Sequence, residues 1–196
     1  TNKKHSFDFP IADQEHKLAE RLRRGDSAAM QDFYAQYGGR LAATCTRYGG
    51  NKEDVKDVLK DTMIKLFTNI SNFEYRGKGS LQAWATRLVI NQSISFLREK
   101  KRQEWTELTW DLPDIPEKED PSVDDLPPEV IQQFICQLPT GYRTVFNLYV
   151  LEEKSHQEIA HLLGIKQASS ASQLHRAKAL LAKMITEYRT HKQEER

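Results

Sequence analysis

The sequence has no long hydrophobic run and very little cysteine. No stretch approaches the roughly 20 apolar residues of a membrane-spanning helix, and Thr1–Pro10 is polar, without the apolar core of a signal peptide. The two cysteines, Cys45 and Cys136, each fall on an apolar helical stripe, which favours buried free thiols over a disulfide. These absences exclude a membrane-inserted or disulfide-framed protein, and we expect a cytoplasmic one.

Regular alternation of apolar and polar residues, which marks a half-buried strand, is also missing. Apolar residues instead recur at helical spacing, so the sequence predicts an all-α fold. One such helix is expected around Phe33 and Tyr37, with Asp26 or Ser27 placed to cap it. The pair Gly38–Gly39 is expected to end that helix, and a new helix is expected to carry Leu41.

Groupings of catalytic or metal-binding side chains are few. Asp54, Asp57 and Asp61 share one helical face at a spacing that suits a divalent cation. Lysines interleave with these carboxylates, which favours a salt-bridged docking or solvent face. His156, His161 and His175 lack metal-ligand spacing, and no glycine loop is suited to cradling a phosphate. The sequence therefore predicts no enzyme, no catalytic residue, no metal and no cofactor.

What the sequence does contain is charge, and the charge is unevenly distributed. The net charge is +1, from 29 lysines and arginines and 28 acidic residues. Residues 72–103 carry seven basic and two acidic groups, and residues 131–196 carry nine and six, whereas residues 104–130 carry one and ten. Two basic modules separated by an acidic strip suit a protein that binds a polyanion at two places. A solvated linker is the alternative interpretation of the strip.

The acidic strip also marks the expected domain boundary. Five prolines between Trp105 and Pro128 predict an extended connection. We therefore predict two small helical domains, at residues 16–103 and 129–190, joined by an acidic linker at 104–128. Residues 1–15 and 191–196 are expected to be tails.

A helix-turn-helix is predicted in the second domain. Ser155 and Glu158 form a capping box that begins one helix, and Gly164 supplies the left-handed residue that ends it. The second helix of such a motif presents side chains to base edges in the major groove. The candidates for contact with duplex DNA are Lys166, Gln167, Ser169, Ser170, Ser172, Gln173, His175, Arg176 and Lys178. A structural helical hairpin with a solvated face is the alternative.

The first domain combines aromatic and basic side chains around a glycine-rich loop. Ser80 is expected to cap a helix running from Leu81 to about Arg102. Unstacked bases need a ring to receive them, cations along the backbone and close approach of the main chain. The candidates for contact with single-stranded DNA are Tyr75, Arg76, Gly77, Lys78, Gly79, Trp84, Arg87, Arg98 and Lys101. Trp84 also suits a core position, so Tyr75 and the loop are the better candidates.

These segments, in this order, resemble the extracytoplasmic-function group of the sigma-70 family of RNA polymerase sigma factors. Asp54–Phe67 is similar to the region 2 helix that docks on the clamp coiled coil of the polymerase. Phe73–Asn91 is similar to the segment that melts the promoter and reads its minus-10 element. Residues 138–146 and 155–181 resemble region 4, which reads the minus-35 element and packs on the polymerase flap.

The resemblance implies roles for individual residues of the first domain. Tyr75 and Asn91 match the pocket for a base flipped from the non-template strand, and Arg76–Ser80 matches the specificity loop. Lys78 and Gly79 lie in the variable part of that loop, so the preferred base does not carry over. The implied contacts with core polymerase are Asp54, Asp57, Val58, Lys60, Asp61, Ile64 and Lys65.

In the second domain, Ser172, His175 and Arg176 match minus-35 contacts. Ala171 and Gln173 stand where the family often has basic residues, so minus-35 affinity is expected to be reduced or differently specified. A free-standing DNA-binding regulator would also use a helix-turn-helix, usually as a dimer on two half-sites. Such a regulator has no use for a melting segment, which favours the sigma-factor interpretation.

The resemblance also implies partners. A sigma factor acts only in complex with core RNA polymerase, through the clamp coiled coil and the flap, and on promoter DNA. An anti-sigma factor that hides the polymerase-binding faces is a further implied partner. The connection between the domains passes near the active-site and RNA-exit channels in this family. Acidic residues such as Asp111, Asp114 and Glu117 are therefore expected either to occupy a basic channel or to form a solvated spacer.

Overall fold

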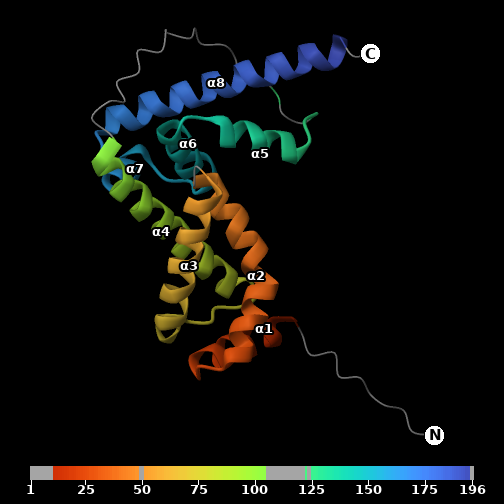
Figure 1. The fold of residues 1–196 in the computed structure, drawn as a ribbon, viewed down its shortest axis with the longest axis vertical. Coiled ribbons are helices and arrows are strands. Elements are labelled where there is room, and N and C mark those ends of the chain that lie inside the picture. Colours follow the sequence, from red (N-terminus) through yellow and green to blue (C-terminus); the bar gives the residue numbers. More distant parts are fainter. Residues whose placement is uncertain (1–10, 49–50, 105–121, 123–124, 195–196) are drawn as a thin grey trace, which may run out of the picture. The chain divides into compact units, whose positions relative to one another are not determined.

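The computed structural model describes residues 11–48, 51–104, 122 and 125–194. Every regular element within these ranges is helical, which confirms the all-α prediction (Figure 1). The chain divides into two compact units, one made of Thr1–Cys45 and Glu53–Ser93, the other of Thr46–Lys52 and Ile94–Arg196. None of the helices in the described ranges is both long enough and apolar enough to span a bilayer.

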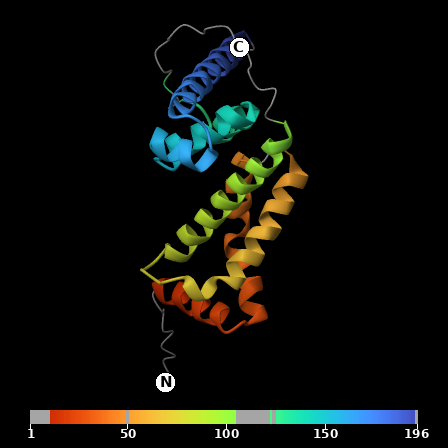
Figure 2. The ribbon, with the colours of Figure 1, turned by 90° about the vertical axis from the view of Figure 1, so that its left-hand side faces the viewer.

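The first unit is built on long helices that share an apolar core, although the C-terminal ends of two of them, residues 46–48 and 94–104, belong to the second unit. Helix α1 spans Ile11–Arg23, α2 spans Ser27–Tyr48, α3 spans Lys52–Thr68 and α4 spans Ser80–Glu104, with a 3₁₀ turn, η1, at Ile70–Asn72. The core-facing side chains include Phe33, Leu41, Leu66, Leu81 and Val89. Helix α1 lies across one end of α2, α3 and α4 (Figure 1 and Figure 2) and contacts η1. This places α1 beside the segment that joins η1 to α4.

Helix α2 differs from the prediction, because it continues through Gly38 and Gly39 as a single helix. A glycine inside a helix costs about 1 kcal/mol relative to alanine. Burial along the face of Phe33, Tyr37 and Leu41 outweighs that cost, since each of these side chains is buried in the core. The predicted break is therefore wrong, and tertiary packing overrides the local preference.

The second unit contains the helices of the C-terminal half. Helix α5 spans Pro128–Gln137, α6 spans Thr140–Phe146, α7 spans His156–Leu163 and α8 spans Gln167–Glu194, and a π-helical turn, η2, occupies Asn147–Leu151. Helices α6 and α7 pack against α8. Arg143 is buried and donates from Nη1 to the carbonyl of Cys136 at 2.7 Å, which ties α6 to the end of α5. Burial lowers the pKa of Arg143.

Several helices extend beyond the predicted domain limits. Helix α1 begins at Ile11, within the expected tail, and α8 continues to Glu194. Helices α4 and α5 likewise reach Glu104 and Pro128, at the two ends of the expected linker. The acidic residues of the linker at positions 105–121 lie outside the described residues.

Candidate nucleic-acid interface

The glycine-rich loop before α4 depends on backbone conformations that favour glycine. Gly77 has φ 113° and Gly79 has φ 89°, and both lie in the left-handed region that other residues rarely adopt. The amide of Ser80 donates to the carbonyl of Gly77 at 3.1 Å and closes the turn. A Cβ added at either glycine would meet no heavy atom within 4 Å, so the loop backbone borders open space. This combination suits close approach of another molecule to the main chain.

The start of α4 is capped differently from the prediction. Helix α4 begins at Ser80 itself, whose hydroxyl accepts the amide of Arg76 at 3.3 Å instead of capping the helix. The carboxylate of Glu15, in α1, accepts the amides of Gly79 and Leu81, each at 2.6 Å. Sequence reasoning missed Glu15, because a cap 64 residues away leaves no local pattern. The sequence signal that could have found Glu15 is its spacing, because this carboxylate falls on the same helical face as the buried residues Leu18 and Leu22.

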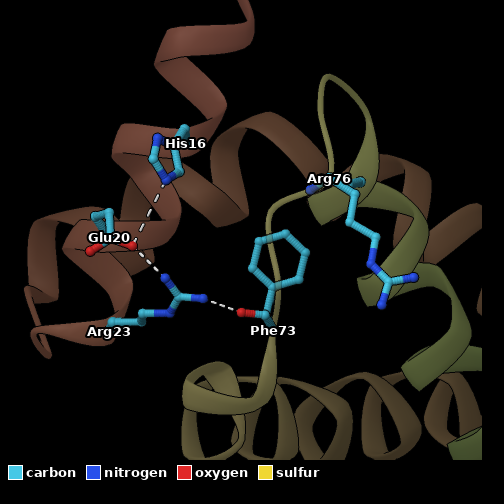
Figure 3. Close-up of polar contacts among 6 residues, drawn as sticks. His16, Glu20, Arg23, Phe73 and Arg76 are labelled. Atoms are coloured by element: carbon cyan, nitrogen blue, oxygen red, sulfur yellow. Dashed lines mark hydrogen bonds and ion pairs between the residues drawn. The ribbon is translucent and has the colours of Figure 1, made fainter.

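Tyr75 lies between the loop and α1. Its ring is half-buried and stacks on the ring of His16, with centroids 4.6 Å apart and an interplanar angle of 24°. Arg23 donates to the carbonyl of Phe73, and Glu20 accepts from Arg23 (Figure 3). The main chain on the N-terminal side of Tyr75 is therefore tied to α1.

Trp84 lies at the edge of the core, neither fully buried nor fully exposed. Its side chain is half-buried and packs on the buried ring of Phe73, with centroids 5.3 Å apart and an interplanar angle of 47°. This packing favours a supporting place beneath the loop.

The remaining candidates of the first domain are mostly exposed to solvent. Arg76 pairs with Glu74 at 3.1 Å, and the arginine side chain is 80 % exposed. Gly77 and Ser80 are half-buried. Besides Arg76, the exposed candidates are Lys78, Gly79, Arg87, Asn91 and Arg98. The side chain of Lys101 lies outside the described residues. Cationic and amide groups suited to phosphates and bases thus remain accessible on the loop and on α4.

The predicted docking residues lie on α3, and most of them face outward. Ile64 is 55 % exposed, an unusual position for a large apolar side chain. Val58 is only 1 % exposed and belongs to the core, so its predicted contact with polymerase is wrong. Asp54 is half-buried, and the exposed members of the set are Asp57, Lys60, Asp61 and Lys65. No cluster of carboxylates, histidines or cysteines suited to a metal ion occurs among the residues that the structure describes.

The predicted helix-turn-helix is formed by α7 and α8. The Ser155 hydroxyl accepts the amide of Glu158 at 3.2 Å, and the Glu158 carboxylate accepts the amide of Ser155 at 2.8 Å. Gly164 has φ 66° and ψ 36° and ends α7. The capping box and the glycine terminus are confirmed. The hydrogen bond from the Ser155 amide is the main cause that lowers the pKa of Glu158.

Helix α8, together with Lys166 directly before it, presents most, but not all, of the predicted DNA-contacting side chains. The exposed members are Lys166, Gln167, Ser172, His175 and Lys178, and the half-buried members are Ser169, Gln173 and Arg176. Arg176 donates to the Tyr142 hydroxyl at 3.4 Å. Ser170 is 0 % exposed and its hydroxyl lies 3.0 Å from Nδ1 of His156, so its predicted contact with DNA is wrong. Ser170 instead joins the start of α8 to α7.

Comparison with known proteins agrees with this arrangement. The family described as Sigma-70 region 2 matches residues 33–103, and the family described as Sigma-70, region 4 matches residues 129–181. The chain is 28 % identical over 180 residues to the ECF RNA polymerase sigma factor SigW of Bacillus subtilis, covering 86 % of this chain and 95 % of that protein. It is 26 % identical to the RNA polymerase sigma-H factor of Pseudomonas aeruginosa, covering 88 % and 94 %.

Solved structures include a similar chain, the sigma factor RpoE in complex with the anti-sigma factor NepR from Bartonella quintana. It is 16 % identical, with a TM-score of 0.45, and the match covers 90 % of this chain and 98 % of that one. The family assignment follows from the sequence matches, because regions 2 and 4 occur here in the same order and the relatives align over most of their length. The chain belongs to the extracytoplasmic-function group of the sigma-70 family.

Proposed function

We propose that this protein binds core RNA polymerase and directs promoter-specific transcription initiation, reading minus-35 duplex and melted minus-10 DNA. The observation that carries the proposal is that one chain contains both a region 2 match with an exposed cationic loop and a region 4 match with a helix-turn-helix. Each module addresses a different form of DNA, single-stranded in the first case and duplex in the second.

For the minus-10 element, the receiving group is Tyr75 together with Asn91 and the loop Arg76–Ser80. A base drawn out of the duplex loses its stacking, and an aromatic ring restores part of that energy. Arg76 and Lys78 are exposed beside the ring, where their charges can neutralise backbone phosphates. The open space above Gly77 and Gly79 permits the nucleotide to approach the main chain.

For the minus-35 element, the N-terminal half of α8 enters the major groove. Ser172, His175 and Arg176 lie at i, i+3 and i+4, which places them on one helical face. Exposed Lys166 and Lys178 contact phosphates and set the register of the helix on the duplex. Gln167, Ser169 and Gln173 complete the polar surface.

For the polymerase, the docking surface is the exposed face of α3 around Ile64, with Asp57, Lys60, Asp61 and Lys65. An apolar centre with a charged rim is the usual anatomy of a protein interface. Region 4 contacts the flap, and an anti-sigma factor competes for these faces. The protein acts wherever the polymerase is, in the cytoplasm, and takes no catalytic part itself.

The proposal is tested by selecting DNA with the holoenzyme formed from the full chain and bacterial core polymerase. The probe is a pool of fork-junction DNA with a randomised duplex at minus-35 and a randomised single strand at minus-10. Enrichment of one motif at each place, which neither partner produces alone, is the expected result. Tyr75→Ala should lose the minus-10 motif and keep the other, whereas Tyr34→Ala, a tyrosine 61 % exposed on α2, should keep both. Selection by the free chain without polymerase, on duplex alone, would contradict the proposal.

A further inference from the structure

Helix α1 contacts both ends of the segment from Phe73 to Leu81. At the C-terminal end of this segment, the Glu15 carboxylate accepts the amides of Gly79 and Leu81, each at 2.6 Å. At its N-terminal end, Arg23 donates to the carbonyl of Phe73, and the His16 ring stacks on the Tyr75 ring with centroids 4.6 Å apart. The segment between Phe73 and Leu81 is thus held by a helix that lies more than 60 positions away along the chain from its capped amides.

The Glu15 contact combines burial with two charge-assisted hydrogen bonds. Glu15 is 6 % exposed, so its carboxylate depends on protein donors in place of water. Each carboxylate oxygen accepts one amide, an arrangement that a neutral amide side chain cannot reproduce, because one of its two polar atoms is a donor. The negative charge also lies at the N-terminus of α4, where the helix dipole favours it.

The outer face of α1 adds a second layer of contacts. Nε2 of His16 lies 4.0 Å from Oε1 of Glu20, the same oxygen accepts from Arg23, and Arg23 reaches Phe73 (Figure 3). In Figure 3 these side chains form a line along α1 toward the segment that leads to Arg76. These contacts fix the position of His16, which stacks on Tyr75, relative to the main chain that precedes Tyr75.

We propose that Glu15 is a positioning residue for base selection, and that α1 sets the conformation in which the loop Arg76–Ser80 reads its base. The inference rests on the proposed function of that loop. Glu15 acts through the amides of Gly79, within the loop, and of Leu81, directly after it, and does not itself touch DNA. Without Glu15 these amides lose their acceptor, and Gly79, whose φ is left-handed, loses the contact that holds its amide.

The direct test measures the loop in the full chain. Hydrogen exchange of the peptide covering residues 76–83 should become about tenfold faster in Glu15→Ala, as expected for the loss of a charge-assisted hydrogen bond. Glu15→Gln keeps the size and one acceptor oxygen, so exchange should be intermediate. Gln14→Ala, an exposed neighbour on the same helix, is the matched control and should leave exchange unchanged.

The functional test repeats the fork-junction selection with holoenzyme. At the minus-10 position that the loop Arg76–Ser80 reads, Glu15→Ala is expected to reduce the ratio of enrichment between the best and the worst base about threefold or more. Glu15→Gln should again be intermediate. Binding to core polymerase, measured by fluorescence anisotropy, should stay within about twofold of wild type, because the docking face on α3 is separate.

The outcomes separate the two claims. A wild-type preference that both Glu15 variants retain would overturn this inference and leave the proposed function intact. A wild-type holoenzyme that shows no base preference would overturn the proposed function, and the inference with it. If Glu15→Ala fails to fold, as judged by circular dichroism, Glu15→Gln decides the matter by the same comparison.

Discussion

Individual carboxylates accept backbone amides where helices begin in this protein. Asp26 accepts the amide of Ala28 at 2.9 Å at the start of α2, and Glu158 accepts that of Ser155 at the start of α7. Both were predictable, because an Asn, Asp, Ser or capping-box pair next to a helix start is a local pattern. Glu15 does the same for α4 from another helix. No rule based on neighbouring residues finds a cap of that kind.

Ser155→Ala is expected to lower the free energy of unfolding by about 1 kcal/mol, because the amide of Glu158 loses its acceptor. Urea unfolding of the full chain measures this change. The matched control is Ser172→Ala, whose hydroxyl is exposed and donates within α8 to the carbonyl of Ser169 at 3.2 Å. The control should change stability by less than about 0.5 kcal/mol. Equal effects of the two substitutions would show that the capping box contributes nothing.

Glu158 predicts a pH dependence of stability. Its pKa is lowered from the ordinary value of 4.5, first by the Ser155 amide. A carboxylate whose pKa is depressed in the folded state contributes stability above its unfolded pKa and loses it as pH falls through the folded value. Glu158→Gln should therefore be less stable than wild type at pH 7, and the difference should shrink as pH falls below about 4.5. Urea midpoints of both proteins at pH 7 and pH 3 test this, and an equal difference at both would contradict it.

At the scale of whole elements, periodicity predicted most helices but not where long ones continue. The pattern around Phe33 and the pattern around Leu41 belong to one helix, because the core buries a continuous face across Gly38 and Gly39. A rule based on local helix propensity registers the two glycines as unfavourable, but it does not include the free energy gained by burying side chains in the core. The helix-turn-helix was predicted closely, since its start and its end are both fixed by local residues. Ser170 was misplaced because its polar side chain is satisfied inside the unit by His156.

Two glycines, one inside a helix and one at a helix end, are expected to affect stability in opposite directions when each is replaced by alanine. Gly39 lies within α2, and a Cβ there meets no heavy atom within 4 Å, so Gly39→Ala should raise the free energy of unfolding by about 0.5–1 kcal/mol. Gly164 ends α7 at φ 66°, and Gly164→Ala should lower it by about 1 kcal/mol. Thermal and urea unfolding of both variants provide the measurement. A destabilised Gly39→Ala would mean that the glycine is required within α2.

At the scale of the whole chain, the distribution of charge was more informative than its total. A net charge of +1 gives no sign of a polyanion partner, whereas the separate basic segments do. The order of the segments then carried the family assignment. Individual contacts are harder to predict, because exposure decides them and exposure depends on packing. Val58 matched the docking segment by position, yet it lies in the core.

Multi-round transcription by bacterial core RNA polymerase on a genomic fragment library, with and without this protein, tests the central claim most directly. Start sites that appear only with the protein are expected. They should weaken in Tyr75→Ala and Arg176→Ala but persist in Tyr34→Ala and in Lys183→Ala, an exposed lysine farther along α8. The contradicting result is a protein that neither binds core polymerase nor produces a start site, yet binds duplex DNA alone, as a free-standing regulator does.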